Sequence, residues 1–225
     1  MKKIFLINFL FIAIFSVTAQ TSIRVINLDV KMGHEDEVAR LFKSYHDVER
    51  KSGAAVLNSV NYLEGVTHQV IFAGDPANWG EKVEKTNTEW EAYIGKLRTH
   101  LNAANGAMVM TNLRWRSGDR EKSKVSKIWE VIPENPTQFL TAYDKFIKAI
   151  DGILGDRITS VTSIDMGGLG GTHSTSLRGS DLNDVILLER EIQKTKAFQD
   201  FIKERGEVKL VKSYLSNNIF VFNRN

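Results

Sequence analysis

The strongest constraint on this fold is that the chain repeats one order of predicted elements. From about Ser22 to Trp115, segments rich in β-branched residues, amphipathic segments and turn residues predict strand, helix, strand, strand, helix, strand. The same order is predicted again from about Lys124 to Phe222. A repeat of this length predicts two similar structural units. We therefore expect an α+β fold made of two tandem βαββαβ units.

The first 19 residues have the layout of a secretory signal peptide. Two lysines precede an apolar stretch of about fourteen residues, and the small residues Val17 and Ala19 predict cleavage before Gln20. This stretch is shorter than the roughly 20 residues that a membrane-spanning helix needs. We expect an exported protein, periplasmic or secreted, without membrane attachment after cleavage.

The charge of the mature chain argues against a nucleic-acid partner. The full sequence has 30 Lys and Arg against 27 Asp and Glu, and two of the lysines lie in the signal peptide, which leaves 28 against 27. No long basic run or basic-aromatic stripe remains. The chain contains no cysteine, so disulfides and thiol chemistry are excluded and a packed core must stabilise the fold.

The mature chain divides at one charged segment without apolar residues, Arg116–Ser123, which contains Gly118. We predict a first repeat over 20–116, a linker over 117–123 and a second repeat over 124–225. The predicted strands are Ser22–Val30, Val56–Leu63, Gln69–Ala73, Ala107–Trp115, Val125–Ile132, Arg157–Met166, Val185–Glu189 and Val208–Phe222. The predicted helices are one from about His34 to Val48, Trp79–Leu101, one from Pro136 to Leu154, and Thr195–Arg205.

The segment VILLEREIQKTKAFQDFIKERGEV has a strand, a short loop and an aromatic-bearing second helix. In this texture and in element order, each half resembles a ferredoxin-like unit of the dimeric α/β-barrel superfamily, which includes antibiotic-biosynthesis-monooxygenase-like proteins and heme-degrading monooxygenases. The resemblance covers the whole mature chain and includes no catalytic signature. It implies that the two antiparallel sheets pack face to face as an intramolecular α/β barrel.

The first predicted strand has apolar residues on both faces, as a strand covered on both sides requires. Asn27 and Asp29 share one face with Ile23 and Val25. In a barrel this face would point inward, so both polar side chains are candidates to line an interior cavity. The alternative is that Asp29 lies at the rim of the barrel and meets water.

The resemblance also suggests a catalytic set: Asn27, Trp90 and His100. Heme-degrading members place an Asn on the first strand and a Trp and a His on the second helix, where the His ligates heme iron. The alternative is structural: Trp90 belongs to the core, His100 is stabilised by the end of its helix, and Asn27 satisfies one hydrogen bond. No metal site is expected apart from His100 if heme is bound, because the histidines show no HxxxH or HxH spacing.

Three further aromatic residues, Trp79, Tyr93 and Trp129, are candidates to line a ligand site. For Trp79 the alternative is an anchor that holds the second helix to the sheet. The glycine-rich segment Gly167–Gly171 lacks the phosphate-loop patterns. It is expected to be a flexible turn or, alternatively, a flap over a cavity mouth.

The expected function is binding of a small molecule between the two sheets, without a cofactor. One alternative is a monooxygenase-like enzyme acting on heme or another aromatic substrate, with heme as its cofactor. The other is a non-catalytic interaction module with a filled barrel. We expect a monomer, with a homodimer as the alternative.

Overall fold

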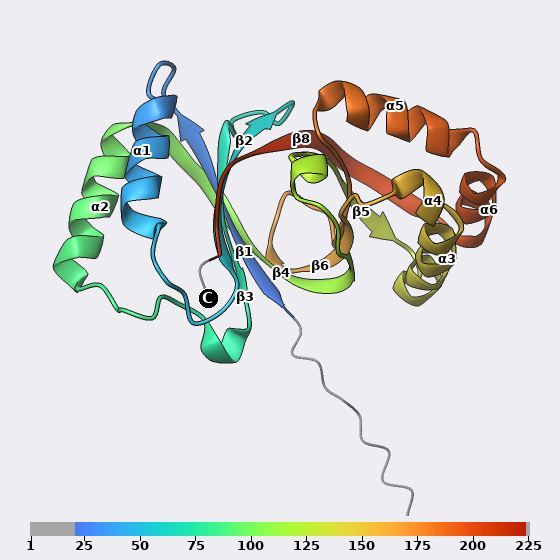
Figure 1. Ribbon diagram of the computed structural model, residues 1–225, viewed down its shortest axis with the longest axis horizontal. Helices are drawn as coiled ribbons and strands as arrows, with labels where there is room; N and C mark the ends of the chain where they lie inside the picture. The colour runs from blue at the N-terminus through green and yellow to red at the C-terminus, as the bar shows by residue number, and fades with distance from the viewer. Residues whose placement is uncertain (1–20, 224–225) are drawn as a thin grey trace, which may run out of the picture.

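The structure is a computed structural model that describes residues 21–223. The predicted signal peptide, 1–19, lies outside the described residues. Eight strands form a closed barrel, and the helices lie in two groups on opposite sides of it (Figure 1). None of the helices in the described part of the chain has the length and apolar character required to cross a membrane.

Each half contains four strands together with the helices that connect them. The strands are β1 (Ser22–Val30), β2 (Ala54–Asn61), β3 (His68–Gly74), β4 (Leu101–Arg116), β5 (Val125–Pro133), β6 (Thr159–Gly167), β7 (His173–Gly179) and β8 (Val208–Phe222). The helices are α1 (Glu35–His46), α2 (Asn87–Thr99), α3 (Pro136–Ala149), α4 (Asp151–Leu154), α5 (Leu182–Gln193) and α6 (Lys196–Glu204). Two 3₁₀ turns are η1 (Pro76–Asn78) and η2 (Glu121–Ser123), and η2 lies in the predicted linker.

The barrel is one continuous antiparallel sheet in the order β1-β3-β2-β8-β5-β7-β6-β4. The strands of the first half are neighbours in the order β4-β1-β3-β2, and those of the second half in the order β8-β5-β7-β6. The edges of the two groups are hydrogen bonded to each other through β2–β8 and β4–β6. The predicted α+β barrel is therefore confirmed, but it is a single closed sheet rather than two separate sheets, because closure pairs every strand edge.

Helices cover the outer face of the barrel in both halves. In the first half, α1 and α2 pack on residues of β1, β2 and β3 such as Leu28, Leu57 and Val70. The predicted stripe on α1 contributes Val38 and Phe42, both 1% exposed. These helices are needed because the outer sheet face is apolar and would otherwise meet water.

The inner face of the barrel is unusually polar. An apolar cluster of Val25, Met108 and Met110 fills part of it. Elsewhere, polar side chains pair across neighbouring strands. These pairs are Asn27 with Gln69 at 3.0 Å, Asn58 with Ser216 at 2.8 Å, and Ser160 with Ser176 at 2.8 Å. Buried polar groups require such partners, so this network fixes the register of the closed barrel.

The glycine-rich segment closes one end of the barrel. Leu169 packs against a buried cluster formed by Val60, Leu63, Val66 and Tyr214. Gly171 lies close to Glu130, since a Cβ atom there would lie 3.0 Å from the Glu130 Cβ, a tight contact. The segment is therefore a packed turn over the barrel end rather than an open flap.

The strand predicted at Val185–Glu189 is wrong, because these residues lie inside α5. The Asp181 side chain accepts a hydrogen bond from the Asp184 backbone amide, an N-cap that starts a helix there. The third strand of the second half is instead β7, in the polar segment His173–Gly179.

The predicted helix Trp79–Leu101 is too long at both ends. The Thr86 hydroxyl and the Glu89 side chain form a capping box, so α2 begins at Asn87. Before it, Gly80 has a φ of 121°, which is incompatible with a helix. After it, β4 already begins at Leu101, whereas the strand was predicted from Ala107.

Candidate functional site

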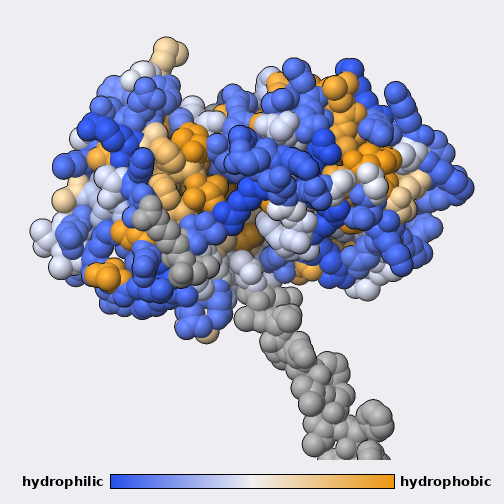
Figure 2. All heavy atoms as spheres, in the orientation of Figure 1, coloured by the Kyte–Doolittle hydropathy of each residue, from blue (hydrophilic) through white to orange (hydrophobic). Residues whose placement is uncertain are grey.

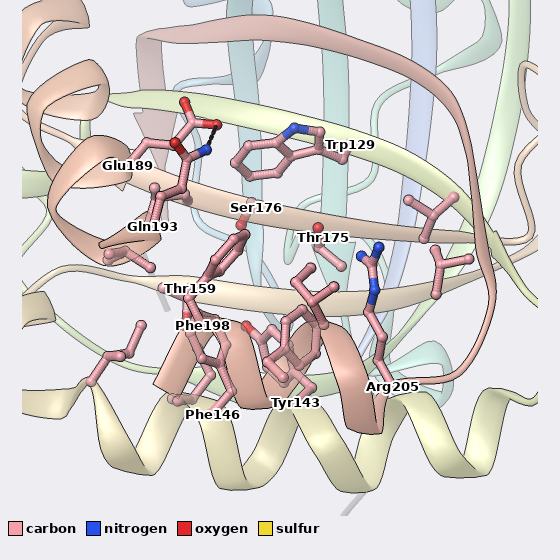
Figure 3. A pocket seen from close by; sticks show the side chains of 18 of the residues that line it. Trp129, Tyr143, Phe146, Thr159, Thr175, Ser176, Glu189, Gln193, Phe198 and Arg205 are labelled. Carbon is pink, nitrogen blue, oxygen red and sulfur yellow. Dashed lines mark hydrogen bonds between the residues drawn. The ribbon is translucent and has the colours of Figure 1, made fainter. Parts of the chain in front are cut away.

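An apolar cavity of about 370 Å³ lies in the second half, between the outer face of the barrel and α3, α5 and α6 (Figure 3). A cavity of this size falls in the range that holds a small organic ligand. Its walls are mostly hydrophobic and aromatic. They include Trp129, Val131, Phe139, Phe146, Ile147, Ile150, Leu177, Ile192, Phe198, Phe201, Ile202, Val208 and Leu210.

The aromatic floor of the cavity is formed where α3 meets α6. Phe146 and Phe201 stack with ring centroids 4.7 Å apart. Phe198 lies at 6.1 Å from Phe146, and Phe139 at 6.1 Å from Phe201. Helical spacing brings these rings to the same faces of α3 and α6. Both helices have N-caps: the Asn135 side chain accepts from the backbone amide of Gln138, and the Thr195 hydroxyl accepts from the backbone amide of Phe198.

The cavity opens toward solvent beside α6 and β8. Ile202 and Leu210 line it and are 40% and 57% exposed. Figure 2 shows hydrophobic side chains gathered on the face of the second half, over α5 and α6. Apolar residues at a mouth are consistent with a site that admits an apolar molecule.

At one wall, three polar side chains hydrogen bond to one another beside Trp129 (Figure 3). The Lys127 ammonium donates to both carboxylate oxygens of Glu189, at 2.9 and 2.7 Å, and lies 5.1 Å from the Trp129 ring centroid. The Gln193 amide donates to the same carboxylate at 3.4 Å (Figure 3). The charge of Glu189 is therefore balanced by Lys127.

A second polar wall carries Arg205, the residue that ends α6. Its guanidinium lies 5.7 Å from the Phe201 ring centroid, and its Nε atom is buried without a hydrogen-bond partner in the described structure. Burial lowers the pKa of Arg205. In contrast to Glu189, Arg205 forms no ion pair with any residue in the range 21–223.

The deep end of the cavity contains Tyr143 and Thr159. Burial raises the pKa of Tyr143 to about 12, against an opposing contribution from the neighbouring Thr159 hydroxyl. Tyr143 is therefore protonated at neutral pH, and its hydroxyl is available to donate a hydrogen bond.

Of the residues predicted to line a ligand site, Trp129 lines this cavity. The others lie elsewhere in the structure. Asn27 is 2% exposed inside the barrel and accepts a hydrogen bond from Gln69. Asp29 is partly exposed on β1. The cavity lies outside the barrel, whereas the site was predicted between the two sheets. On the inner face of the barrel, polar and apolar side chains pack against one another.

The predicted set Asn27, Trp90 and His100 is not brought together. Asn27 points into the barrel, whereas α2, which carries Trp90, packs on its outer face. Trp90 is 47% exposed. His100 caps the end of α2, where its Nδ1 lies 2.8 Å from the Nδ1 of His34.

Two more candidates belong to the packing of the first half. Tyr93 is 7% exposed and stacks on Tyr45 at 4.2 Å between ring centroids. Trp79 follows η1 in the loop before α2, and is partly exposed. Neither residue lines the cavity of the second half.

The residues that form the cavity were visible in the sequence only as core. Phe139, Tyr143, Phe146 and Ile150 form the apolar stripe of α3, which any packed helix would show. The α5 wall was missed because the Val185–Glu189 segment was assigned to a strand. One signal was available: Arg205 follows an apolar helix face and has no acidic residue four positions before it.

The cavity does not offer the usual axial ligands of heme. No histidine or methionine lines it, and the chain contains no cysteine. Tyr143 does line it but is held protonated by burial. Across the part of the chain that the structure describes, no three His, Asp or Glu side chains are grouped so as to hold a metal ion.

Comparison with known proteins shows the fold but not the family. No protein-family model matches the chain, and no curated protein matches it. Among solved structures, the chain is similar to a proposed monooxygenase from Lactobacillus acidophilus NCFM, with a TM-score of 0.61, 10% identity, and coverage of 91% of this chain and 97% of that chain. It is also similar to an anthrone oxidase-like protein, with a TM-score of 0.57, 9% identity, and coverage of 92% and 94%.

A third similar structure is a proposed chlorite dismutase, with a TM-score of 0.51, 6% identity, and coverage of 89% of this chain and 95% of that chain. All three matches span nearly the full length of both chains, so they compare the whole barrel and both helical layers. At these identities the likeness establishes a dimeric α+β barrel fold and leaves the chemistry to the residues of the site.

Proposed function

We propose that the protein binds a small organic molecule in the cavity between the barrel and α3, α5 and α6. The observation that carries this proposal is the cavity itself: about 370 Å³ of space with aromatic and aliphatic walls and a few polar side chains at its ends. Close packing is the rule in protein interiors, so a space of this size is not a packing defect of ordinary extent.

A second candidate is an enzyme that oxygenates an aromatic substrate in the same cavity. The stacked pair Phe146 and Phe201, with Phe198 tilted beside Phe146, favours an aromatic molecule. Similar structures include a proposed monooxygenase and an anthrone oxidase-like protein, which adds to this candidate through the fold alone.

Heme as the bound molecule has less support, because the cavity lacks the usual axial ligands and His100 lies in the other half, beside His34. Titration with hemin tests this alternative. We expect no Soret band that depends on His100, measured by comparing the wild-type protein with His100→Ala. A band that His100→Ala removes would restore the heme hypothesis.

The proposed binding site is tested by filling it. Thr175 lies on β7 and lines the cavity, so Thr175→Phe should occupy the space that a ligand needs. Isothermal titration calorimetry with 2-naphthamide, an uncharged aromatic probe, should show binding to the wild-type protein and at least tenfold weaker binding to Thr175→Phe. Thr111→Phe adds the same ring to β4, away from the cavity, and should bind as the wild type does. Equal binding by both variants would place the probe elsewhere.

We also propose that the two halves are structural copies. The equivalent strand orders β4-β1-β3-β2 and β8-β5-β7-β6 support this proposal. If the chain is split within 117–123 and the halves are co-expressed, they should copurify, since each half exposes two strand edges without the other. A single half that elutes alone as a well-behaved monomer would contradict it.

We propose in addition that the protein acts after export. The signal-like composition of 1–19 supports this. Mass spectrometry of protein purified from its native host should find a chain that begins at Gln20, and an intact Met1 would contradict export by cleavage.

A further inference from the structure

The charges around the cavity do not cancel. Glu189 is balanced by Lys127 at 2.7 Å and accepts a further hydrogen bond from Gln193. Arg205 has no carboxylate partner in residues 21–223. The cavity therefore carries one uncompensated positive charge at the end where α6 finishes, and low-dielectric walls strengthen its attraction for an anion.

The acidic residue nearest to Arg205 in the sequence does not neutralise it. Glu204 pairs with Lys145, whose Nζ donates to Glu204 Oε2 at 2.8 Å. The Glu204 backbone carbonyl accepts from the Gln138 amide at 2.8 Å. Both contacts hold Glu204 on the outer side of α6, against α3, while Arg205 lines the cavity.

The position of Arg205 is fixed by its own helix. Its backbone amide donates to the Phe201 carbonyl at 2.9 Å, and its guanidinium lies beside the Phe201 ring. An arginine can stack on an aromatic ring and still keep N–H groups free at the edge of its guanidinium. These groups can donate two parallel hydrogen bonds to one carboxylate. Arginine keeps its charge at neutral pH in this setting.

The cavity walls away from Arg205 are mostly aromatic and apolar and would contact the uncharged part of the ligand. Trp129 and Phe198 offer broad ring faces on opposite elements, β5 and α6 (Figure 3). Aromatic rings stack on such faces at little cost in conformational entropy. The polar groups at the far end, Tyr143 and Thr159, are few and uncharged.

We propose that the ligand is an aromatic carboxylate whose ring system lies among Trp129, Phe146 and Phe198 and whose carboxylate pairs with Arg205. This inference rests on the proposed function, since it names the chemical class that the same cavity binds. It assigns Arg205 as the residue that selects an anion over an uncharged molecule of the same shape.

The test compares 2-naphthoate with 2-naphthamide, which share a ring system and differ in charge, by isothermal titration calorimetry. The wild-type protein should bind the carboxylate at least tenfold more tightly than the amide, since a hydrogen bond to a charged group is stronger than one to a neutral group. Arg205→Gln should remove this preference, so that both probes bind with similar affinity. Arg205→Lys should keep part of it.

Arg190→Gln is the matched control, because Arg190 is an exposed arginine of α5 that does not line the cavity. It should bind both probes as the wild type does. Far-ultraviolet circular dichroism verifies that each variant is folded. If both probes bind and Arg205→Gln leaves the preference intact, or no preference exists, the role of Arg205 is overturned while the cavity site stands. If neither probe binds the wild-type protein, the proposed function fails and this inference fails with it.

Discussion

The two halves of the molecule pack helices on the same outer face of the barrel, yet they fill the interface differently. In the first half, Tyr45 and Tyr93 stack at 4.2 Å and His46 lies edge-on to Tyr93 at 5.3 Å, so aromatic rings occupy the space between α1, α2 and the sheet. In the second half, Phe146 and Phe201 stack against each other at 4.7 Å and leave a cavity of about 370 Å³. One architecture thus accommodates both a packed core and an open cavity.

The two halves also differ in how their buried and half-buried cations are paired with carboxylates. In the first half, Glu81 is approached by Arg50 at 3.7 Å and forms an ion pair with Lys85, while Lys85 lies 4.2 Å from the Tyr45 ring centroid. Both cations therefore have a carboxylate within ion-pair distance. In the second half, Arg205 finds none among the described residues. The two halves therefore differ in whether a cation that borders the helical layer has a carboxylate partner.

The largest expected effect tests the packing difference. Phe42→Ala should lower the free energy of unfolding by about 3–5 kcal/mol, because Phe42 is 1% exposed and fully enclosed by the first core. Phe146→Ala should cost about 1–2 kcal/mol, because Phe146 is only partly buried and already borders open space. Urea unfolding monitored by circular dichroism measures both values.

These two variants remove the same ring, so their difference reports the surroundings rather than the residue. Tyr62→Ala, at a site 79% exposed, provides the baseline and should change the free energy of unfolding by less than about 0.5 kcal/mol. Equal losses for Phe42→Ala and Phe146→Ala would mean that the second half is packed as tightly as the first.

The next largest expected effect is a loss of stability at acidic pH that depends on His46. Burial, reinforced by the positive charges of Lys85 and Arg50, lowers the pKa of His46 from its ordinary value of 6.5 to about 3. The folded protein therefore holds His46 neutral, while the unfolded chain takes up a proton below pH 6.5. The stabilising contribution of the neutral ring is complete above pH 6.5 and is lost as the pH falls toward 3, with a slope approaching about 1.4 kcal/mol per pH unit.

His46→Gln should flatten this dependence between pH 6 and pH 4, as measured by urea unfolding at each pH. His173, in the second half, is the comparison: burial lowers its pKa too, but Asp165 opposes the shift. His173→Gln should therefore flatten the dependence less. A larger effect for His173 than for His46 would contradict the assignment of acid sensitivity to the first half.

The sequence was sufficient to predict the α+β barrel, but it did not predict α5, which forms one wall of the cavity. Strand β7 alternates polar residues because its inner face looks into a polar barrel, where Ser176 pairs with Ser160. That composition is typical of a loop, so β7 was missed. The apolar segment Val185–Glu189 was then assigned to the missing strand, although the Asp181 cap marks a helix.

The cavity itself could not be predicted for a different reason. The apolar stripe of α3, which includes Phe139 and Phe146, has the same spacing as the stripe of α1, which includes Val38 and Phe42. Periodicity indicates which face is covered, but it does not indicate whether the facing side chains meet. Filling depends on the distance and direction of helices set by long-range contacts, and these are properties of the assembled structure.

The smallest expected effect concerns the N-caps of α2 and α6, which separate an effect on stability from an effect on binding. Thr86→Ala removes the capping box of α2. Thr195→Ala removes the hydroxyl that caps α6, which accepts a hydrogen bond from the Phe198 backbone amide at 3.1 Å. Each should lower the free energy of unfolding by about 1 kcal/mol, since each leaves backbone donors without their acceptor. Only Thr195→Ala should also weaken binding of 2-naphthoate, by about two- to fivefold, because it loosens the turn that carries Phe198 into the cavity. Calorimetry and urea unfolding on the same samples distinguish the two effects, and equal weakening of binding by Thr86→Ala would show that global stability, not the geometry of α6, limits the site.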